Sequence, residues 1–115
     1  MTTILYVEDH PPAQLLMAAI VTDLTSYTLI TAKTGAEAET LARTNHLEAY
    51  ILDLDLPDTD GISLAERLNA IYPAVTIIVS AYAEAIHPDQ KYLYLAKPLD
   101  PDHVAQILRH ALTGR

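Results

Sequence analysis

Apolar residues in this chain occur in two patterns that alternate along its length. Short apolar runs bounded by turn residues are typical of buried strands, whereas apolar positions three or four residues apart are typical of one face of a helix. The runs that we interpret as strands are Ile4–Val7, Thr28–Ala32, a run that ends at Asp53, Val75–Val79 followed by Ser80, and Tyr92–Ala96.

Helical periodicity follows the first three of these runs and the last one. Pro11 and Pro12 suit the first turn of a helix, where no backbone donor is needed. Thr34 with Glu37 predicts a capping box for the second helix, and Asp60 can cap the third. The predicted inner faces of the four helices comprise Ala13, Leu16, Met17, Ile20 and Leu24; Ala38, Leu41 and Ala42; Leu64, Ala65, Leu68 and Ile71; and Val104, Ile107, Leu108 and Ala111.

Strands that alternate with helices predict an α/β fold with a parallel sheet covered on both faces, because a parallel strand pair needs a crossover connection. Parallel strands all end at the same edge of the sheet, and open sheets of this kind bind ligands at that edge. The residues that should meet there are Glu8, Asp9, Asp53, Ser80 and Lys97.

The composition bounds the class of protein. The 115 residues are 50% hydrophobic and contain no linker or repeat, so residues 1–115 are interpreted as one compact domain. No cysteine is present, which excludes disulfides and thiol chemistry and fits a reducing compartment. The chain has neither a membrane-spanning apolar run nor a signal peptide pattern, and we expect it in the cytoplasm.

The net charge of −8 argues against binding to nucleic acid or to an anionic membrane, which both favour clustered Lys and Arg. Proteins and cations are the expected partners. Carboxylates gathered at one edge of a sheet repel each other, and Mg²⁺, with Mn²⁺ as a substitute, would offset that repulsion because it prefers oxygen ligands. With Lys97 and Ser80 nearby, the arrangement suits Asp53 as a nucleophile that accepts a phosphoryl group.

The chain resembles the receiver (CheY-like) domain of two-component response regulators. The matching pieces are the acidic pair Glu8-Asp9, the segment 53–57 with Gly61, Ser80 followed by a small residue, and Lys97-Pro98. The resemblance implies a flavodoxin-like (βα)5 three-layer sandwich with strand order 2-1-3-4-5. It also implies that a histidine kinase or a histidine phosphotransfer protein supplies the phosphoryl group from a phosphohistidine.

The resemblance assigns roles around the metal ion. Asp9 and Asp53 would ligate Mg²⁺ directly, and the main-chain carbonyl of Asp55 would be a third protein ligand. Glu8 would act mostly through a metal-bound water.

It assigns further roles around the phosphoryl group. Ser80 would move to hydrogen-bond it, Lys97 would pair with it, and Tyr94 would be the aromatic residue that swings inward as part of the switch. Tyr92 and Tyr94 alternate with leucines, so packing within the sheet is as good an interpretation of Tyr94 as the switch role. The side chains of Asp55 and Tyr82 are expected to tune the lifetime of the phosphoryl group.

One segment departs from the family pattern. Only residues 81–91 connect the fourth and fifth predicted strands, and Pro88 lies among them. A full fourth helix does not fit in this length, and we predict a loop or a single helical turn. Many receivers dimerise or dock an effector protein on the surface that the fourth helix helps to form, so this departure bears on output.

Two other functions remain open at this point. Asp53-Leu54-Asp55 also matches the nucleophile and acid/base pair of haloacid-dehalogenase-like phosphohydrolases, although that motif normally lies on a first strand. A docking module that keeps the receiver fold without phosphorylation is the second alternative. If the chain is a receiver domain, we do not expect a dedicated multiple-turnover enzyme, although such a domain can remove its own phosphoryl group. The sequence does not decide between a stand-alone regulator and part of a longer protein.

Overall fold

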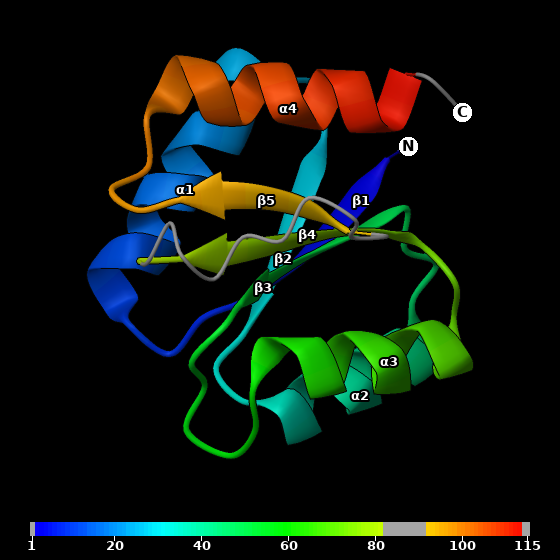
Figure 1. The fold of residues 1–115 in the computed structure, drawn as a ribbon. Coiled ribbons are helices and arrows are strands. Elements are labelled where there is room, and N and C mark those ends of the chain that lie inside the picture. Colours follow the sequence, from blue (N-terminus) through cyan, green and yellow to red (C-terminus); the bar gives the residue numbers. More distant parts are fainter. Residues whose placement is uncertain (1, 82–91, 114–115) are drawn as a thin grey trace.

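The structure is a computed structural model that describes residues 2–81 and 92–113. These residues form a five-stranded sheet in the order β2-β1-β3-β4-β5, with every neighbouring pair parallel (Figure 1). The predicted α/β class and strand order are therefore confirmed. The strands are β1 Thr3–Val7, β2 Thr28–Ala32, β3 Ala49–Asp53, β4 Val75–Ser80 and β5 Leu93–Ala96.

Helices cover both faces of the sheet, which gives the three predicted layers (Figure 1). On one face lie α1 (Pro11–Leu24) and α4 (Pro101–Thr113), and on the other lie α2 (Gly35–Thr44) and α3 (Gly61–Ile71). The loop or single turn predicted for the segment 81–91 falls, apart from Ala81, outside the described residues.

Both predicted helix caps are present. The Thr34 hydroxyl accepts a hydrogen bond from the backbone N–H of Glu37 at 3.1 Å, and the Asp60 carboxylate accepts one from the N–H of Ser63 at 2.8 Å. Glu37 differs from a regular capping box, because its carboxylate accepts from the N–H of Lys33 at 2.6 Å rather than from Thr34. These side chains satisfy N–H groups that the first turn of each helix leaves free.

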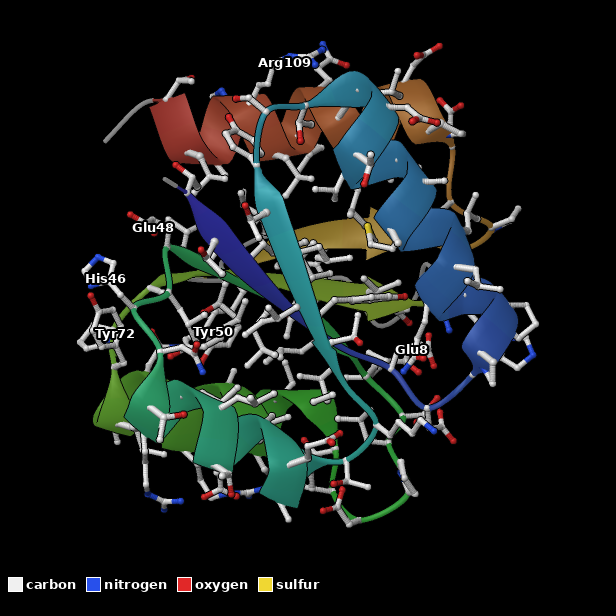
Figure 2. All side chains as sticks on the ribbon, turned by 180° about the vertical axis from the view of Figure 1, so that it is seen from behind. Glu8, His46, Glu48, Tyr50, Tyr72 and Arg109 are labelled. Atoms are coloured by element: carbon white, nitrogen blue, oxygen red, sulfur yellow. The ribbon has the colours of Figure 1, made fainter. Side chains whose placement is uncertain are left out.

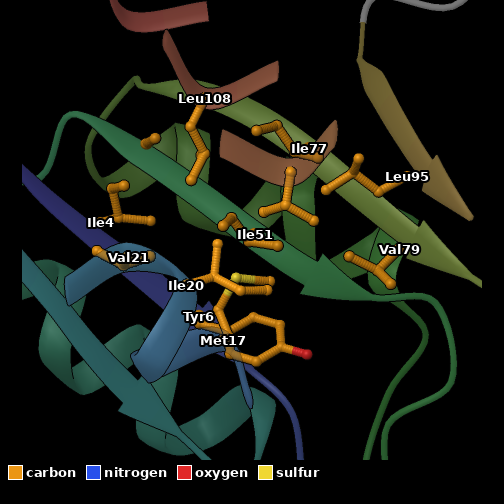
Figure 3. Packing of buried hydrophobic residues seen from close by; sticks show 12 residues of the cluster. Ile4, Tyr6, Met17, Ile20, Val21, Ile51, Ile77, Val79, Leu95 and Leu108 are labelled. Atoms are coloured by element: carbon orange, nitrogen blue, oxygen red, sulfur yellow. The ribbon is translucent and has the colours of Figure 1, made fainter. Parts of the chain in front are cut away.

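The core consists of one apolar cluster on each face of the sheet, and successive strand residues contribute to opposite clusters. Figure 3 shows the cluster between the sheet and the α1 and α4 helices. The prediction for α1 was wrong at two positions: Leu16 is 41% and Leu24 is 38% exposed, whereas Val21 is 1% exposed. Met17, Ile20 and Val21 lie three and four residues apart on the face that meets the sheet, so the apolar pattern of α1 is wider than its buried stripe.

Tyr72 contacts both Tyr50 and His46 at the amino-terminal edge of the sheet (Figure 2). The buried Tyr50 hydroxyl donates to the carbonyl oxygens of Tyr72, at 2.6 Å, and Leu68, at 3.3 Å. His46 packs edge-on against the Tyr72 ring, with the ring centroids 5.2 Å apart, and its Nδ1 hydrogen-bonds the Tyr72 hydroxyl. Among the described residues, no helix is both long enough and apolar enough to span a membrane.

Candidate functional site

Three carboxylates meet at the carboxyl-terminal edge of the sheet. Glu8 and Asp9 directly follow β1, and Asp53 is the last residue of the neighbouring strand β3. One oxygen from each of the three side chains lies within 4.8 Å of the others. Glu8 and Asp53 are buried and Asp9 is exposed, so the cluster opens to solvent on the Asp9 side. The convergence of these residues, predicted from parallel strands, is what the structure shows.

Lys97 completes the cluster from the end of β5. Its Nζ lies 3.1 Å from Oε1 of Glu8 and 3.4 Å from Oδ1 of Asp53. The N–H of Lys97 donates to the carbonyl oxygen of Ser80 at 2.9 Å, which ties this residue to the end of β4. Lys97 therefore bridges two of the three carboxylates. Ser80 is 2% exposed and is joined to Lys97 by this main-chain hydrogen bond.

Glu8 is held by neighbours that sequence reasoning missed. Its Oε1 accepts from the hydroxyl of Tyr6 at 3.4 Å, and its Oε2 accepts from the backbone N–H of His10 at 3.3 Å. Tyr6 is fully buried in β1, and its hydroxyl is the polar atom that Figure 3 shows at the margin of the core. The apolar run Ile4–Val7 predicts a strand but not this contact of Tyr6. The available signal was its position two residues before Glu8, which places both side chains on one side of the strand.

The electrostatics follow from burial and from charge crowding. Burial of the Asp53 carboxyl group and the negative charge of Glu8 raise the pKa of Asp53 to about 6, while Lys97 acts in the opposite direction. Burial disfavours the charged form of Lys97, but its hydrogen bond to Glu8 and the charges of Asp53 and Glu8 outweigh this and raise the pKa of its ammonium group. A second positive charge at this site would stabilise the ionised carboxylates further.

The residues fit a hard divalent cation. All three clustered side chains offer oxygen atoms, and the exposure of Asp9 leaves room for the waters that Mg²⁺ retains. Burial and the negative charge of Glu8 both raise the pKa of Asp53, and a cation bound here would oppose this shift.

Main-chain hydrogen bonds hold both ends of the loop after β3. The N–H of Leu54 donates to the carbonyl of Val79 at 2.9 Å, and the N–H of Gly61 donates to the carbonyl of Leu54 at 2.8 Å. A Cβ atom at Gly61 would lie only 2.6 Å from the carbonyl oxygen of Asp53, so this position requires glycine. Asp55 is exposed in this loop and pairs with Asp60 in a short antiparallel bridge.

Two further predicted residues are Tyr94 and Tyr82. Tyr94 is half-buried, pairs with Ile78 of β4, and packs against the apolar cluster on the α2 and α3 side. This contact agrees with the packing interpretation, and the switch role stays a prediction. Tyr82 lies outside the described residues, and its predicted effect on phosphoryl lifetime is untested.

Comparison with known proteins identifies the family. The family described as response regulator receiver domain matches residues 4–109. The chain belongs to this family. Receiver domains bind Mg²⁺ in an acidic pocket, and this chain has a group of three acidic residues, Glu8, Asp9 and Asp53.

Individual relatives agree with this assignment. The chain is 33% identical over 119 residues to the transcriptional regulatory protein KdpE of Mycobacterium tuberculosis, covering 97% of this chain and 51% of KdpE. A CheY-like receiver domain structure from Methylobacillus flagellatus is similar with a TM-score of 0.87 and 25% identity, over 96% of this chain and 98% of that one. The receiver domain of the sensor histidine kinase PA1611 from Pseudomonas aeruginosa, with a magnesium ion coordinated in its active site cleft, has a TM-score of 0.82 and 26% identity, over 97% and 98% of the two chains.

The chain spans about half of KdpE and only 13% of the sensor protein TorS from Escherichia coli. The matching region is thus a module of longer proteins in these relatives.

Proposed function

We propose that this receiver domain accepts a phosphoryl group on Asp53 in a Mg²⁺-dependent reaction and thereby switches a protein–protein interaction. The observation that carries the proposal is the position of Lys97 Nζ, 3.1 Å from Glu8 and 3.4 Å from Asp53, within a cluster of three carboxylates. A phosphoryl transfer needs little covalent help from a protein, and positioning and charge stabilisation supply most of the catalysis.

The metal site of this proposal consists of four residues. Asp9 and Asp53 would bind the ion through carboxylate oxygens, the main-chain carbonyl of Asp55 would be the third protein ligand, and Glu8 would act through a metal-bound water. Bound Mg²⁺ supplies positive charge that lowers the repulsion among the carboxylates and stabilises the oxygens of the transferring group. The mutual approach of the three carboxylates to within 4.8 Å supports the part of this set that consists of Glu8, Asp9 and Asp53.

The chain's own groups act on the phosphoryl group as follows. A carboxylate oxygen of Asp53 attacks phosphorus, the bond between phosphorus and the donor histidine nitrogen breaks, and the histidine leaves with the electron pair of that bond. Lys97 pairs with the phosphoryl oxygens in place of part of its present contact with Asp53. Ser80 donates its hydroxyl hydrogen to the same group, and Tyr94 moves with it as the switch.

The partners follow from this chemistry. The phosphoryl donor is a histidine kinase or a histidine phosphotransfer protein. The phosphorylated domain then binds an effector protein or a second copy of this chain. Asp55 and Tyr82 tune the rate at which water removes the phosphoryl group. The cytoplasmic location expected from the sequence is part of the proposal, because the absence of cysteine fits a reducing compartment.

A time course with a small phosphodonor tests the proposal. The protein is incubated with acetyl phosphate and Mg²⁺, and its intact mass is followed together with the release of inorganic phosphate. The expected result is one phosphoryl group per chain that persists after removal of the donor, that requires Mg²⁺, and that is absent in Asp53→Asn.

The two alternatives give different time courses. Continuous phosphate release without an accumulating phosphoprotein would indicate a phosphohydrolase. That alternative lacks support, because Asp53 ends the third strand of a receiver fold and Glu8-Asp9 would have no role. The absence of both a phosphorylated protein and phosphate release under every condition would indicate a docking module.

A further inference from the structure

The loop that carries the proposed metal ligand Asp55 is tied at its tip to a helix that is distant in sequence. Asp58 lies at that tip, and its two carboxylate oxygens accept from the first two N–H groups of α2. Oδ1 lies 2.8 Å from the nitrogen of Gly35, and Oδ2 lies 3.1 Å from the nitrogen of Ala36. These two hydrogen bonds connect positions 23 and 22 residues apart, so Asp58 links two separate elements.

Close packing supports this link. A Cβ atom at Gly35 would lie 2.8 Å from Cγ2 of Thr59 and 3.4 Å from Oδ1 of Asp58. The loop therefore approaches the start of α2 as closely as a glycine permits. The hydrogen bonds from Gly35 and Ala36 also lower the pKa of Asp58, so its carboxylate is ionised and accepts both bonds at neutral pH.

The start of α2 has two caps with separable effects. Thr34 satisfies the N–H of Glu37, whereas Asp58 satisfies those of Gly35 and Ala36. Thr34 belongs to the segment that leads into α2 and makes its capping bond within that helix. Asp58 belongs to the loop after β3, so only the second cap joins the helix to the phosphoacceptor loop.

We propose that Asp58 is a positioning residue for the metal site: its carboxylate, held by the first turn of α2, fixes the loop that contains Asp55, whose main-chain carbonyl would bind the cation. The root of the loop is held by the bonds of Leu54 and Gly61, and its tip by Asp58. Residues that orient metal ligands without touching the metal affect affinity strongly, because the ligands must be in place before the ion binds. This inference rests on the proposed function, since it assumes that Asp55 ligates the ion.

The test is a Mg²⁺ titration followed by amide chemical shifts. In the wild-type chain, Mg²⁺ should shift the amide resonances of Leu54 and Gly61, and also those of Gly35 and Ala36 through the link. In Asp58→Ala, the Mg²⁺ dissociation constant should rise about tenfold, and the shifts at Gly35 and Ala36 should disappear. Phosphorylation by acetyl phosphate at a subsaturating Mg²⁺ concentration should slow by a similar factor and recover at saturating Mg²⁺.

Two variants separate positioning from simple stabilisation. Thr34→Ala removes the other cap of α2 and should lower stability by a similar amount, yet leave the Mg²⁺ dissociation constant unchanged. Asp58→Asn removes the charge and one of the two acceptor oxygens, so it can keep only one of the two hydrogen bonds to α2 and should retain part of the wild-type affinity. Urea unfolding of each variant verifies that all are folded in the titration.

The outcomes are distinct. Unchanged Mg²⁺ affinity in Asp58→Ala, or an equal loss in Thr34→Ala, would overturn the inference and leave the proposed function intact. Absence of Mg²⁺ binding by the wild-type chain would overturn the proposed metal site itself.

Discussion

The two edges of the sheet both carry buried polar groups. Those at the amino-terminal edge are neutral, whereas the carboxyl-terminal edge also has charged ones. At the amino-terminal edge, the Tyr50 hydroxyl donates to the main-chain oxygens of Tyr72 and Leu68. At the carboxyl-terminal edge, Glu8 and Asp53 share one ammonium group, that of Lys97. Figure 2 shows Glu8 at the opposite end of the molecule from Tyr50 and Tyr72.

We infer from this difference that the amino-terminal edge serves stability and the carboxyl-terminal edge serves function. A neutral hydroxyl with two acceptors satisfies the buried groups around it and leaves no charge to compensate. Two buried carboxylates share one cation, and burial of the Asp53 carboxyl group together with the negative charge of Glu8 raises the pKa of Asp53 to about 6. An arrangement that costs stability in the absence of a ligand is typical of a binding or catalytic site.

Lys97→Met should produce the largest change, because it removes the charge that compensates Glu8 and Asp53. In the presence of EDTA, the free energy of unfolding should fall by about 2 kcal/mol, less than for a fully buried pair because the Lys97 side chain is 32% exposed. Phosphorylation by acetyl phosphate should slow by at least about tenfold, since a charge on the transferring group is lost. Urea unfolding and intact mass measure the two effects.

Lys33→Met is the matched control, because Lys33 is an exposed lysine at the end of β2. It should leave both quantities nearly unchanged. Equal effects of the two substitutions would contradict the assigned role of Lys97.

Tyr50→Phe should affect stability alone. It removes the hydroxyl that donates to Tyr72 and Leu68, and leaves a buried carbonyl without this donor, at a cost of about 1–2 kcal/mol in the free energy of unfolding. Mg²⁺ affinity and phosphorylation rate should stay as in the wild type. A loss of phosphorylation in folded Tyr50→Phe would mean that the two edges are coupled and would remove the contrast between them.

Asp60→Ala should have a smaller effect that depends on pH. Hydrogen bonds from the N–H and hydroxyl of Ser63 hold the pKa of Asp60 below its ordinary value of 3.8. A carboxyl group whose pKa is lowered by folding stabilises the fold above its unfolded pKa and loses this contribution as the pH falls through its folded pKa. The substitution should therefore cost about 1 kcal/mol at neutral pH.

The difference between wild type and Asp60→Ala should shrink as the pH falls below 3.8. Urea unfolding at neutral and acidic pH measures it. Asp60→Asn is the control: both variants lack the carboxyl group, so the difference in stability between Asp60→Asn and Asp60→Ala should not depend on pH. A difference that stays constant with pH in Asp60→Ala would show that the charge of Asp60 does not contribute.

Local patterns predicted the elements well, because their signals lie within each element. Short apolar runs marked the five strands, and Thr34 and Asp60 marked two helix starts that the structure confirms. The order of the strands came from the resemblance to the receiver family. Parallel strand ends predicted that Glu8, Asp9, Asp53 and Lys97 would meet, and they do.

Other features depend on tertiary contacts that local patterns do not contain. Leu16 and Leu24 fit the apolar period of α1, yet the sheet covers only the narrower stripe around Met17 and Ile20. The bonds of Asp58 to α2 join residues more than twenty positions apart, and an acidic residue in a turn gives no sign of such a partner.

Localisation of the phosphoryl group tests the central claim most directly. After phosphorylation by acetyl phosphate with Mg²⁺, borohydride reduces an acyl phosphate to an alcohol, and peptide mapping then identifies the altered residue. The account predicts reduction of Asp53 to homoserine, dependent on Mg²⁺, with no modification in Asp53→Asn. Modification of another residue, or equal labelling of Asp53→Asn, would contradict it.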